Sequence, residues 1–305
     1  MFTVTSVSIA APPARWADGV GLPLAAGAAG MVFVGGSVAA SGVLAGAPLF
    51  TVQALRYAVA CVLLIGFARV RRVPLVAPRG TEWLWLGGVT AAGLVIFNVA
   101  LVQGARHAEP AVLGVAVSCV PLLFAVVGPL LKGHRPAPGV VVAALVVTAG
   151  ATLVQGVGRS DGIGLLWAAV VLAGEAGFTL LAVPLLDRHG AVGLSVHATW
   201  LAAAAFAVLG ALTEGPAAAG RLHAAQVLAG AYLAVGVTAV AFVLWYTSVD
   251  RLGAGRAGLL TGITPVAAAV AGVALGGPWP RPVVWAGVVT VVAGLALGLR
   301  RRDPA

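Results

Sequence analysis

The sequence is poor in charge, which excludes most classes of soluble protein. Asp, Glu, Lys and Arg together make up 9% of the 305 residues, whereas a soluble domain carries about 25%. Hydrophobic residues make up 61%, and the mean hydropathy is +1.06. The net charge of +9 would suit a nucleic-acid partner, but the chain has no polar segment that could form a soluble basic face. The composition therefore predicts an integral membrane protein that binds no nucleic acid.

Motifs that carry chemistry are also lacking. Cys61 and Cys119 lie inside apolar runs without the spacing of metal ligands, so we interpret them as small buried hydrophobic residues. The sequence has no phosphate-binding loop and no Ser-His-Asp arrangement in a soluble domain. Residues 1–20 lack a basic segment ahead of an apolar core, which argues against a cleaved signal peptide. We therefore predict no catalytic residue, no metal and no cofactor.

Apolar runs of about 20 residues are abundant, and this length crosses a hydrocarbon core of about 30 Å. We expect an all-α integral membrane fold of ten transmembrane helices joined by short loops. The predicted helices are 22–45, 48–69, 83–104, 109–131, 138–157, 162–186, 190–212, 225–248, 254–276 and 281–300.

Loop charges predict the orientation of these helices. With the N-terminus inside the cell, the cytoplasmic segments hold thirteen basic residues and the outer loops four, the asymmetry expected from the positive-inside rule. The cytoplasmic set is Arg15, Arg69, Arg71, Arg72, Arg79, Lys132, Arg135, Arg188, Arg251, Arg256, Arg300, Arg301 and Arg302. The outer set is Arg106, Arg159, Arg221 and Arg281. Both termini are therefore predicted to be cytoplasmic, in the plasma (inner) membrane.

The chain contains an internal duplication with an offset of 144 residues. Residues 111–153 read AVLGVAVSCVPLLFAVVGPLLKGHRPAPGVVVAALVVTAGATL, and residues 255–297 read GRAGLLTGITPVAAAVAGVALGGPWPRPVVWAGVVTVVAGLAL. Prolines and loop glycines stay in register without a gap; for example, Pro121 matches Pro265 and Gly150 matches Gly294. Two such halves predict a repeated unit.

The duplication extends to earlier helices and divides the chain. TVQALRY at 51–57 matches SVHATWL at 195–201 with the same offset, whereas GVTA at 88–91 recurs at 236–239 with an offset of 148, a slip of about one helical turn. The predicted division is a tail at 1–20, one repeat at 21–158, a second repeat at 159–300 and a tail at 301–305. Because each repeat holds five helices, the second is inverted in the membrane, an arrangement typical of secondary transporters.

This layout resembles the drug/metabolite transporter superfamily, in particular its EamA-type exporters. The similarity is carried by the first helix pair with its arginine (31–64) and by the proline-bearing helices in 111–131 and 257–277. It covers about 20–300, and it implies a ten-helix exporter whose central cavity is built from helices 1, 3, 4, 6, 8 and 9.

One family feature is missing. The family often has Leu-Gly-Glu after helices 4 and 9, but this chain reads Leu-Lys-Gly at 131–133 and Leu-Gly-Gly at 275–277. The resemblance therefore gives no support for a proton-coupling carboxylate at these positions.

Two matched prolines are candidate hinges. Pro121 and Pro265 lie in the middle of apolar helices, where each removes a backbone hydrogen bond and favours a kink. The kink could serve helix packing alone, or the two prolines could form paired hinges on the wall of a cavity. Ser118, Thr261 and Thr264 lie within one turn and could bond the freed carbonyls or face a substrate.

Glu175 is the most informative single residue. It lies in the middle of the apolar run at 162–186, where a charge costs roughly 2.5–3.5 kcal/mol on insertion scales. We predict a role in the substrate or proton pathway, as a contact for a cationic group or as a proton carrier. The alternative is a neutral carboxyl bonded to a neighbouring helix.

Further polar candidates lie on other helices. Arg56 is the only Lys or Arg inside an apolar segment, and it could extend toward the outer interface, anchor the fold or bind an anionic group. Gln53 and its repeat partner His197 form a matched polar pair, and Asn98 adds an amide. Trp245 and Tyr246 lie nearer a helix end, which favours an interfacial aromatic belt over substrate stacking.

We predict from these features a secondary transporter, or a facilitator, that exports a metabolite, amino acid or drug-like solute by alternating access. The partners would be this small-molecule substrate and the lipid bilayer, with protons as a candidate coupling ion. The oligomeric state is open, a homodimer included. The rival interpretations are a membrane-embedded lipid-handling enzyme and a partner protein without transport activity.

Overall fold

The structure is a computed structural model that describes residues 16–44, 46–131, 133–276 and 279–300. Within these ranges the secondary structure is helical, apart from an isolated β-bridge between Ala108 and Ser160. The first half contains α1 (Trp16–Val43), α2 (Leu49–Val70), α3 (Glu82–Gly88), η1 (Val89–Ile96), α4 (Phe97–Gly104), α5 (Pro110–Ser118), α6 (Val120–Leu131) and α7 (Pro138–Gln155). The second half contains α8 (Gly162–Leu180), α9 (Val183–Thr213), η2 (Ala218–Arg221), α10 (Ala224–Tyr232), η3 (Leu233–Val240), α11 (Ala241–Leu259), η4 (Leu260–Gly262), α12 (Ile263–Ala274) and α13 (Pro282–Arg300).

The structure describes part of the predicted N-terminal tail and none of the predicted C-terminal tail. Residues 1–15 and 301–305 lie outside the described residues. Residues 16–20, which the sequence places in the N-terminal tail, are already part of α1. The first helix therefore begins earlier than predicted.

Among the described residues, eight helical segments are long and apolar enough to cross a membrane, and a shorter apolar helix lies at Gly21–Ser37. The eight are Leu49–Val70, Glu82–Gly104, Pro110–Leu131, Pro138–Gln155, Gly162–Leu180, Val183–Thr213, Ala224–Ala274 and Pro282–Leu299. The sequence-based expectation of an all-helical fold is confirmed. The count of ten spans stays a prediction.

Two of the longest segments are interrupted at a glycine. Gly190 inside α9 has φ 60° and ψ 175°, and Gly253 inside α11 has φ 77° and ψ 154°. Positive φ is accessible to glycine at little cost, so the backbone can leave helical geometry there. The break at Gly253 falls within the predicted loop at 249–253, whereas the break at Gly190 falls on the first residue of the predicted helix 190–212, just after the predicted loop at 187–189.

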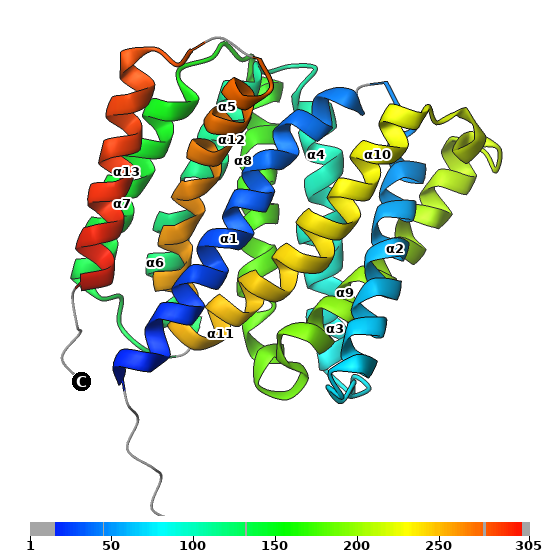
Figure 1. The fold of residues 1–305 in the computed structure, drawn as a ribbon, viewed down its shortest axis with the longest axis horizontal. Coiled ribbons are helices and arrows are strands. Elements are labelled where there is room, and N and C mark those ends of the chain that lie inside the picture. The colour runs from blue at the N-terminus through cyan, green and yellow to red at the C-terminus, as the bar shows by residue number, and fades with distance from the viewer. Residues whose placement is uncertain (1–15, 45, 132, 277–278, 301–305) are drawn as a thin grey trace, which may run out of the picture.

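Helices at matching positions of the two halves pack against each other. In Figure 1, α7 and α13 lie together at one end of the molecule, and α2 lies beside α9 at the other. In further contacts between the halves, α1 packs on α11 and α12, while α8 packs on η1 and α4 and also on α5 and α6. Each half thus places its first helix against the third and fourth segments of the other half.

A pair of π-helices repeats with the offset of the duplication. The first, η1, covers Val89–Ile96 and the second, η3, covers Leu233–Val240. Both ends of the two elements differ by 144 residues, which is also the offset of the proline-bearing stretches. The structural register therefore does not follow the slip to 148 residues that the GVTA match suggests.

The crossing of α7 and α13 depends on glycine. A Cβ added to Gly150 would lie 2.7 Å from the backbone nitrogen of Val291, and one added to Gly294 would lie 2.9 Å from that of Val147. Small residues let helix backbones approach closely in membranes, where lipid supplies no hydrophobic driving force. These two matched glycines therefore hold the last helices of both halves together.

Much of the outer surface is apolar. Leu84, Leu166, Leu212 and Val289 are 64–78% exposed, and many other large apolar side chains are similarly open. A surface of this kind would promote aggregation in water, whereas hydrocarbon covers it without cost. The surface thus fits the membrane environment that the composition predicts.

Polar contacts join the loop before α5 to the segment that links the two halves. The Arg159 Nε donates to Glu109 Oε1 at 2.8 Å, and this hydrogen bond lowers the pKa of the Glu109 carboxyl. Asp161 accepts from the backbone nitrogen of Gly164 at 2.7 Å, caps the start of α8 and has a lowered pKa for that reason first. His107 lies 3.0 Å from the same Asp161 carboxyl. These contacts fix where the second half begins.

Candidate functional site

Arg56 lies within α2, half-buried, and contacts only neutral groups. Its Nε donates to Thr238 Oγ1 at 2.7 Å, and its Nη1 donates to Gln53 Oε1 at 3.3 Å. The guanidinium carbon lies 5.1 Å from the centre of the Tyr57 ring, within range of a cation–π contact. No ion pair found among the described residues includes Arg56. A guanidinium within an apolar helix thus has no carboxylate partner among the described residues.

The neutral groups around Arg56 continue as a hydrogen-bonded network. Gln53 Nε2 donates to Asn98 Oδ1 at 2.7 Å, and Asn98 Nδ2 donates to Leu94 O at 2.6 Å and more weakly to Tyr57 at 3.4 Å. We call Gln53, Arg56, Tyr57, Asn98 and Thr238 the polar cluster. It brings together three predicted residues, Arg56, Gln53 and Asn98, from two helices of the first half.

The π-helices position this cluster. Asn98 bonds the carbonyl of Leu94 in η1, and Thr238 in η3 donates to Leu233 O, five residues earlier, at 2.9 Å. A π-turn widens a helix by one residue and often marks a functional position. One π-helix from each half therefore supplies an acceptor for a side chain of the cluster.

Glu175 lies on α8, half-buried, and forms no hydrogen bond with any described residue. The preceding turn is packed tightly, since a Cβ added to Gly174 would lie 2.8 Å from the carbonyl oxygen of Ala92. The neighbours of Glu175 on the same helix, Phe178 and Thr179, accept hydrogen bonds from the Tyr246 hydroxyl and from Trp245 Nε1 of α11.

Trp245 and Tyr246 do not form an interfacial belt, and that interpretation of the sequence is wrong. Both are buried, at 4% and 0% exposure. Trp245 Nε1 donates to Thr179 Oγ1 at 2.9 Å, and the Tyr246 hydroxyl donates to Phe178 O at 3.1 Å. The two rings face α8 rather than lipid, because distance from a helix end does not determine which face a residue occupies. They tie α11 to the segment that carries Glu175.

The matched prolines coincide with breaks in their helices. The α-helix is interrupted at Cys119, two residues before Pro121, and η4 is a 3₁₀ turn just ahead of Pro265. Loss of the proline N–H explains both breaks.

Hydroxyl groups next to the prolines bond matched carbonyls. Ser118 Oγ donates to Gly114 O at 2.9 Å, and Thr261 Oγ1 donates to Gly258 O at 2.8 Å. Gly114 and Gly258 are 144 residues apart, so the two halves use the same device. Thr264 differs, because its hydroxyl lies 3.4 Å from Met31 Sδ.

His197 makes its contacts in a different place from Gln53, its repeat partner. Its Nε2 lies 2.9 Å from Val76 O, and its Nδ1 lies 3.4 Å from Trp200 Nε1. A carbonyl only accepts and an indole N–H only donates, so His197 is neutral with its proton on Nε2. The ring also lies edge-on to His189 at 5.2 Å.

The same region contains an ion pair between the halves. Glu82 accepts from Arg188 Nη1 and lies 3.2 Å from His189 Nε2. Together with His197, these contacts fasten residues 76–82 to α9. The hydrogen bonds of His197 and its ring contact with His189 are thus separate from the polar cluster.

Tyr57 is a member of the polar cluster that sequence reasoning missed. It is 1% exposed and stacks on Phe206 with a ring separation of 5.7 Å. The available signal was its place next to Arg56 in an apolar run, away from the helix ends where belt tyrosines gather.

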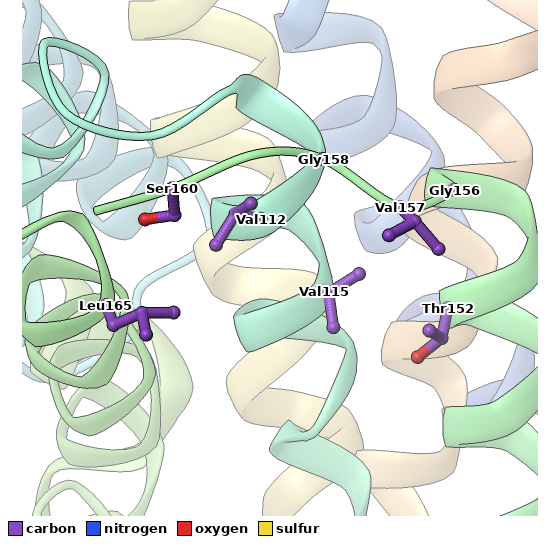
Figure 2. Close-up of a pocket in the computed structure, with 8 residues that line it drawn as sticks. All are labelled: Val112, Val115, Thr152, Gly156, Val157, Gly158, Ser160 and Leu165. Atoms are coloured by element: carbon purple, nitrogen blue, oxygen red, sulfur yellow. The ribbon is translucent and has the colours of Figure 1, made fainter. Parts of the chain in front are cut away.

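Two cavities among the described residues lie away from the polar cluster and Glu175. One of about 340 Å³, shown in Figure 2, lies between α5, α7 and the segment that joins the halves, and among its lining residues only Thr152 and Ser160 have polar side chains. A second of about 300 Å³ lies at the other ends of the helices, around the loop after α6. Neither is lined by the polar cluster or Glu175. Within the described residues, no group of three His, Cys, Asp or Glu could hold a metal ion.

Comparison with known proteins gives a consistent match. The EamA-like transporter family matches residues 21–155 and again residues 162–300. The "Uncharacterized transporter YetK" of Bacillus subtilis (strain 168) is 27% identical over 292 residues, which is 91% of this chain and 87% of that protein. A solved structure described as "Crystal structure of protein" has a TM-score of 0.78 at 21% identity and covers 92% of this chain and 99% of its own. At that identity it shows the fold alone.

Proposed function

The chain belongs to the EamA-like transporter family, and we propose that it is a secondary transporter that exports a small solute across the plasma membrane by alternating access. The proposal includes ten helices in two inverted repeats, at 21–158 and 159–300, with both termini in the cytoplasm. The reciprocal packing of the halves supports it, because inverted repeats that exchange contacts can rock about a shared site.

The observation that carries the proposal is a pair of opposite charges without ionic partners. Arg56 contacts neutral groups alone, and Glu175 forms no hydrogen bond with the described residues. Each is costly to place in an apolar helix, and a polar solute or a proton would offset that cost. The charges come from different halves, so a solute that contacts them contacts both moving parts.

The two charges would act at different depths. At about 1.5 Å per residue, Arg56 lies about 10 Å from the start of α2, and Glu175 about 20 Å from the start of α8. In the proposed topology both helices start at the outer face of a core about 30 Å thick, which places Arg56 about 5 Å to the outer side of the midplane and Glu175 about 5 Å to its cytoplasmic side. We assign Glu175 the cationic group of a solute or the coupling proton, and Arg56 an anionic or polar group.

The proposed solute class is a metabolite, amino acid or drug-like molecule. Protons are the first candidate for the coupling ion, and facilitated diffusion is the alternative because the usual glutamates after helices 4 and 9 are absent. A homodimer is part of the proposal only as an option, since a ten-helix unit contains both halves of the site.

The test begins with metabolite profiling of a deletion strain and an overexpression strain, which should show the same solute changing in opposite directions. The purified protein alone is then placed in liposomes, and uptake of that solute is measured at several imposed pH gradients. Counterflow without any partner protein supports the transporter. Absence of counterflow across a broad metabolite panel would favour an enzyme or a partner protein instead.

A further inference from the structure

We propose that the second cavity is a binding site for the headgroup of an anionic phospholipid. This cavity, which we call the cationic pocket, has a volume of about 300 Å³. It is lined by Ala125, Gly128, Pro129, His134, Arg135, Ala137, Val140, Val183, Leu252, Gly253, Ala254, Gly255 and Arg256. The inference goes beyond transport, because it concerns a molecule that the protein binds and does not move.

The charged side chains of the pocket are all of one sign. Arg135 and Arg256 line it together with the imidazole of His134, and no lining residue is acidic. His134 and Arg135 are exposed and Arg256 is half-buried. Arginine presents a planar set of donors that matches phosphate oxygens. The pocket therefore favours a phosphate-bearing anion.

The rest of the pocket is apolar. Val140, Val183 and Leu252 form part of its wall, and Leu130 and Leu131, each 55% exposed, follow at the end of α6. A soluble phosphate compound would leave this apolar surface unused. A phospholipid would place its headgroup among the arginines and its acyl chains along the exposed leucines. Basic pockets between membrane helices on the cytoplasmic side bind anionic lipid headgroups in this way.

The backbone adds a smaller contribution of the same sign. Helical geometry breaks at Gly253, so residues 254–256 begin a new helical stretch where they line the pocket. The first amide groups of a helix carry partial positive charge and favour an anion. This effect supports the arginines and does not by itself define a site.

The duplication provides an internal comparison. With the offset of 144, His134, Arg135 and Arg256 correspond to Pro278, Trp279 and Val112. Val112 lines the cavity of Figure 2, whose lining residues carry no charge. All three basic residues of the pocket are therefore absent from the matching positions, which lie on the opposite membrane face in the proposed topology.

The positive-inside rule alone does not explain the pocket. That rule requires basic residues in cytoplasmic loops but not at any particular place within them. Here two separate segments, the loop after α6 and the break in α11, bring their basic side chains to one cavity. Convergence of this kind indicates a ligand rather than topology alone.

The test measures how much lipid the purified protein retains in detergent, by native mass spectrometry. The lipid probes are phosphatidylglycerol, which is anionic, and phosphatidylcholine, which has no net charge. We expect the protein to retain phosphatidylglycerol in preference. Each arginine removed, Arg135→Gln or Arg256→Gln, should lower that retention about fivefold, and the double variant about 25-fold.

Two controls decide the result. Arg281→Gln removes a basic residue from the matching loop of the second half and should leave retention unchanged. The double Lys variant (Arg135→Lys and Arg256→Lys) keeps the charge and should keep most of the retention, even if the Gln variants fold poorly. Equal retention of the two lipids by the unaltered protein, or unchanged retention in a folded double Gln variant, would overturn the site.

A competition experiment separates the two sources of phosphate. Millimolar inorganic phosphate should not displace phosphatidylglycerol, since it cannot use the apolar wall. Complete displacement by inorganic phosphate would overturn the lipid assignment in favour of a soluble phosphate compound.

Discussion

The two halves of the molecule have similar backbone features at matched positions and differ in which of those positions carry a charged side chain. Pro121 and Pro265, the two π-helices, and Gly150 and Gly294 occupy matched positions and have matched geometry. Glu175 is matched instead by the buried Met31, and Arg56 by Trp200, which is 39% exposed. Positions that shape helices are thus equal in both halves, whereas the charged positions are unique. Folding and function are separable by comparing matched residues.

The largest expected effect concerns the close crossing of α7 and α13, which depends on matched glycines of both halves. Gly150→Leu forces a side chain into the backbone of α13, so it should destabilise the fold by about 3 kcal/mol and sharply lower the yield of folded protein. Gly272→Leu is the control with the same substitution at an open site, because a Cβ there would meet nothing within 4 Å. Thermal unfolding and gel filtration in detergent measure both. Equal stability of the two variants would mean that the close crossing of α7 and α13 is not needed.

The second-largest effect concerns transport activity, and the stability of the fold should not change. Glu175→Gln removes the unmatched carboxylate but keeps its size, so transport should fall by about tenfold or more, the factor that corresponds to 1.4 kcal/mol of lost interaction. Met31→Gln, at the matched position of the other half, should retain transport. Liposome uptake, normalised to the amount of inserted protein, gives the comparison. Normal transport by Glu175→Gln would remove that residue from the substrate or proton pathway.

The third effect separates two threonines with the same sequence context, GVTA. Thr238 bonds Arg56 and the carbonyl of Leu233, so Thr238→Val should destabilise the protein by about 2 kcal/mol, the range of hydrogen bonds to charged groups. The buried Thr90 hydroxyl has no hydrogen-bond partner in the described part of the chain. Thr90→Val should therefore be neutral or stabilising. Melting temperatures in detergent measure the difference, and equal losses would contradict it.

The smallest effect concerns the junction of the halves. Glu109 has a lowered pKa because of Arg159, so it stabilises the folded state above its ordinary pKa of about 4.5. That contribution should disappear as the pH falls through the lower folded-state pKa. The position matched to Glu109 is Gly253, so the other half has no such contact. Glu109→Gln should flatten the acid side of a melting-temperature profile, and Asp250→Asn, the exchange of an acid elsewhere, should not.

The sequence was sufficient for the helical class, the duplication and the unmatched charges. The length of each apolar run and the spacing between matched prolines can be measured in the sequence itself. The helical class and the duplication can therefore be predicted without coordinates. Arg56, Gln53 and Asn98 were also identified individually, because polar groups are rare in apolar helices. Their assembly into one hydrogen-bonded network required knowledge of which helix faces meet.

The misplaced residues show what a one-dimensional pattern cannot contain. Trp245 and Tyr246 were assigned to the surface from their distance along a helix, but burial depends on rotation about its axis. Gln53 and His197 occupy matched positions, yet one bonds Asn98 and the other bonds Val76. The GVTA match gave an offset of 148, while the π-helices follow 144. Identity of a few letters was a weaker guide than backbone geometry.

The paired π-helices also record the order of events in the history of this chain. A π-turn contains one residue more than the α-turn it replaces, so it originates from a single insertion. Two independent insertions at the same register in both halves would be a coincidence, whereas one insertion in a common ancestor gives both. A single insertion that preceded the duplication therefore accounts for the shared register of the two π-helices.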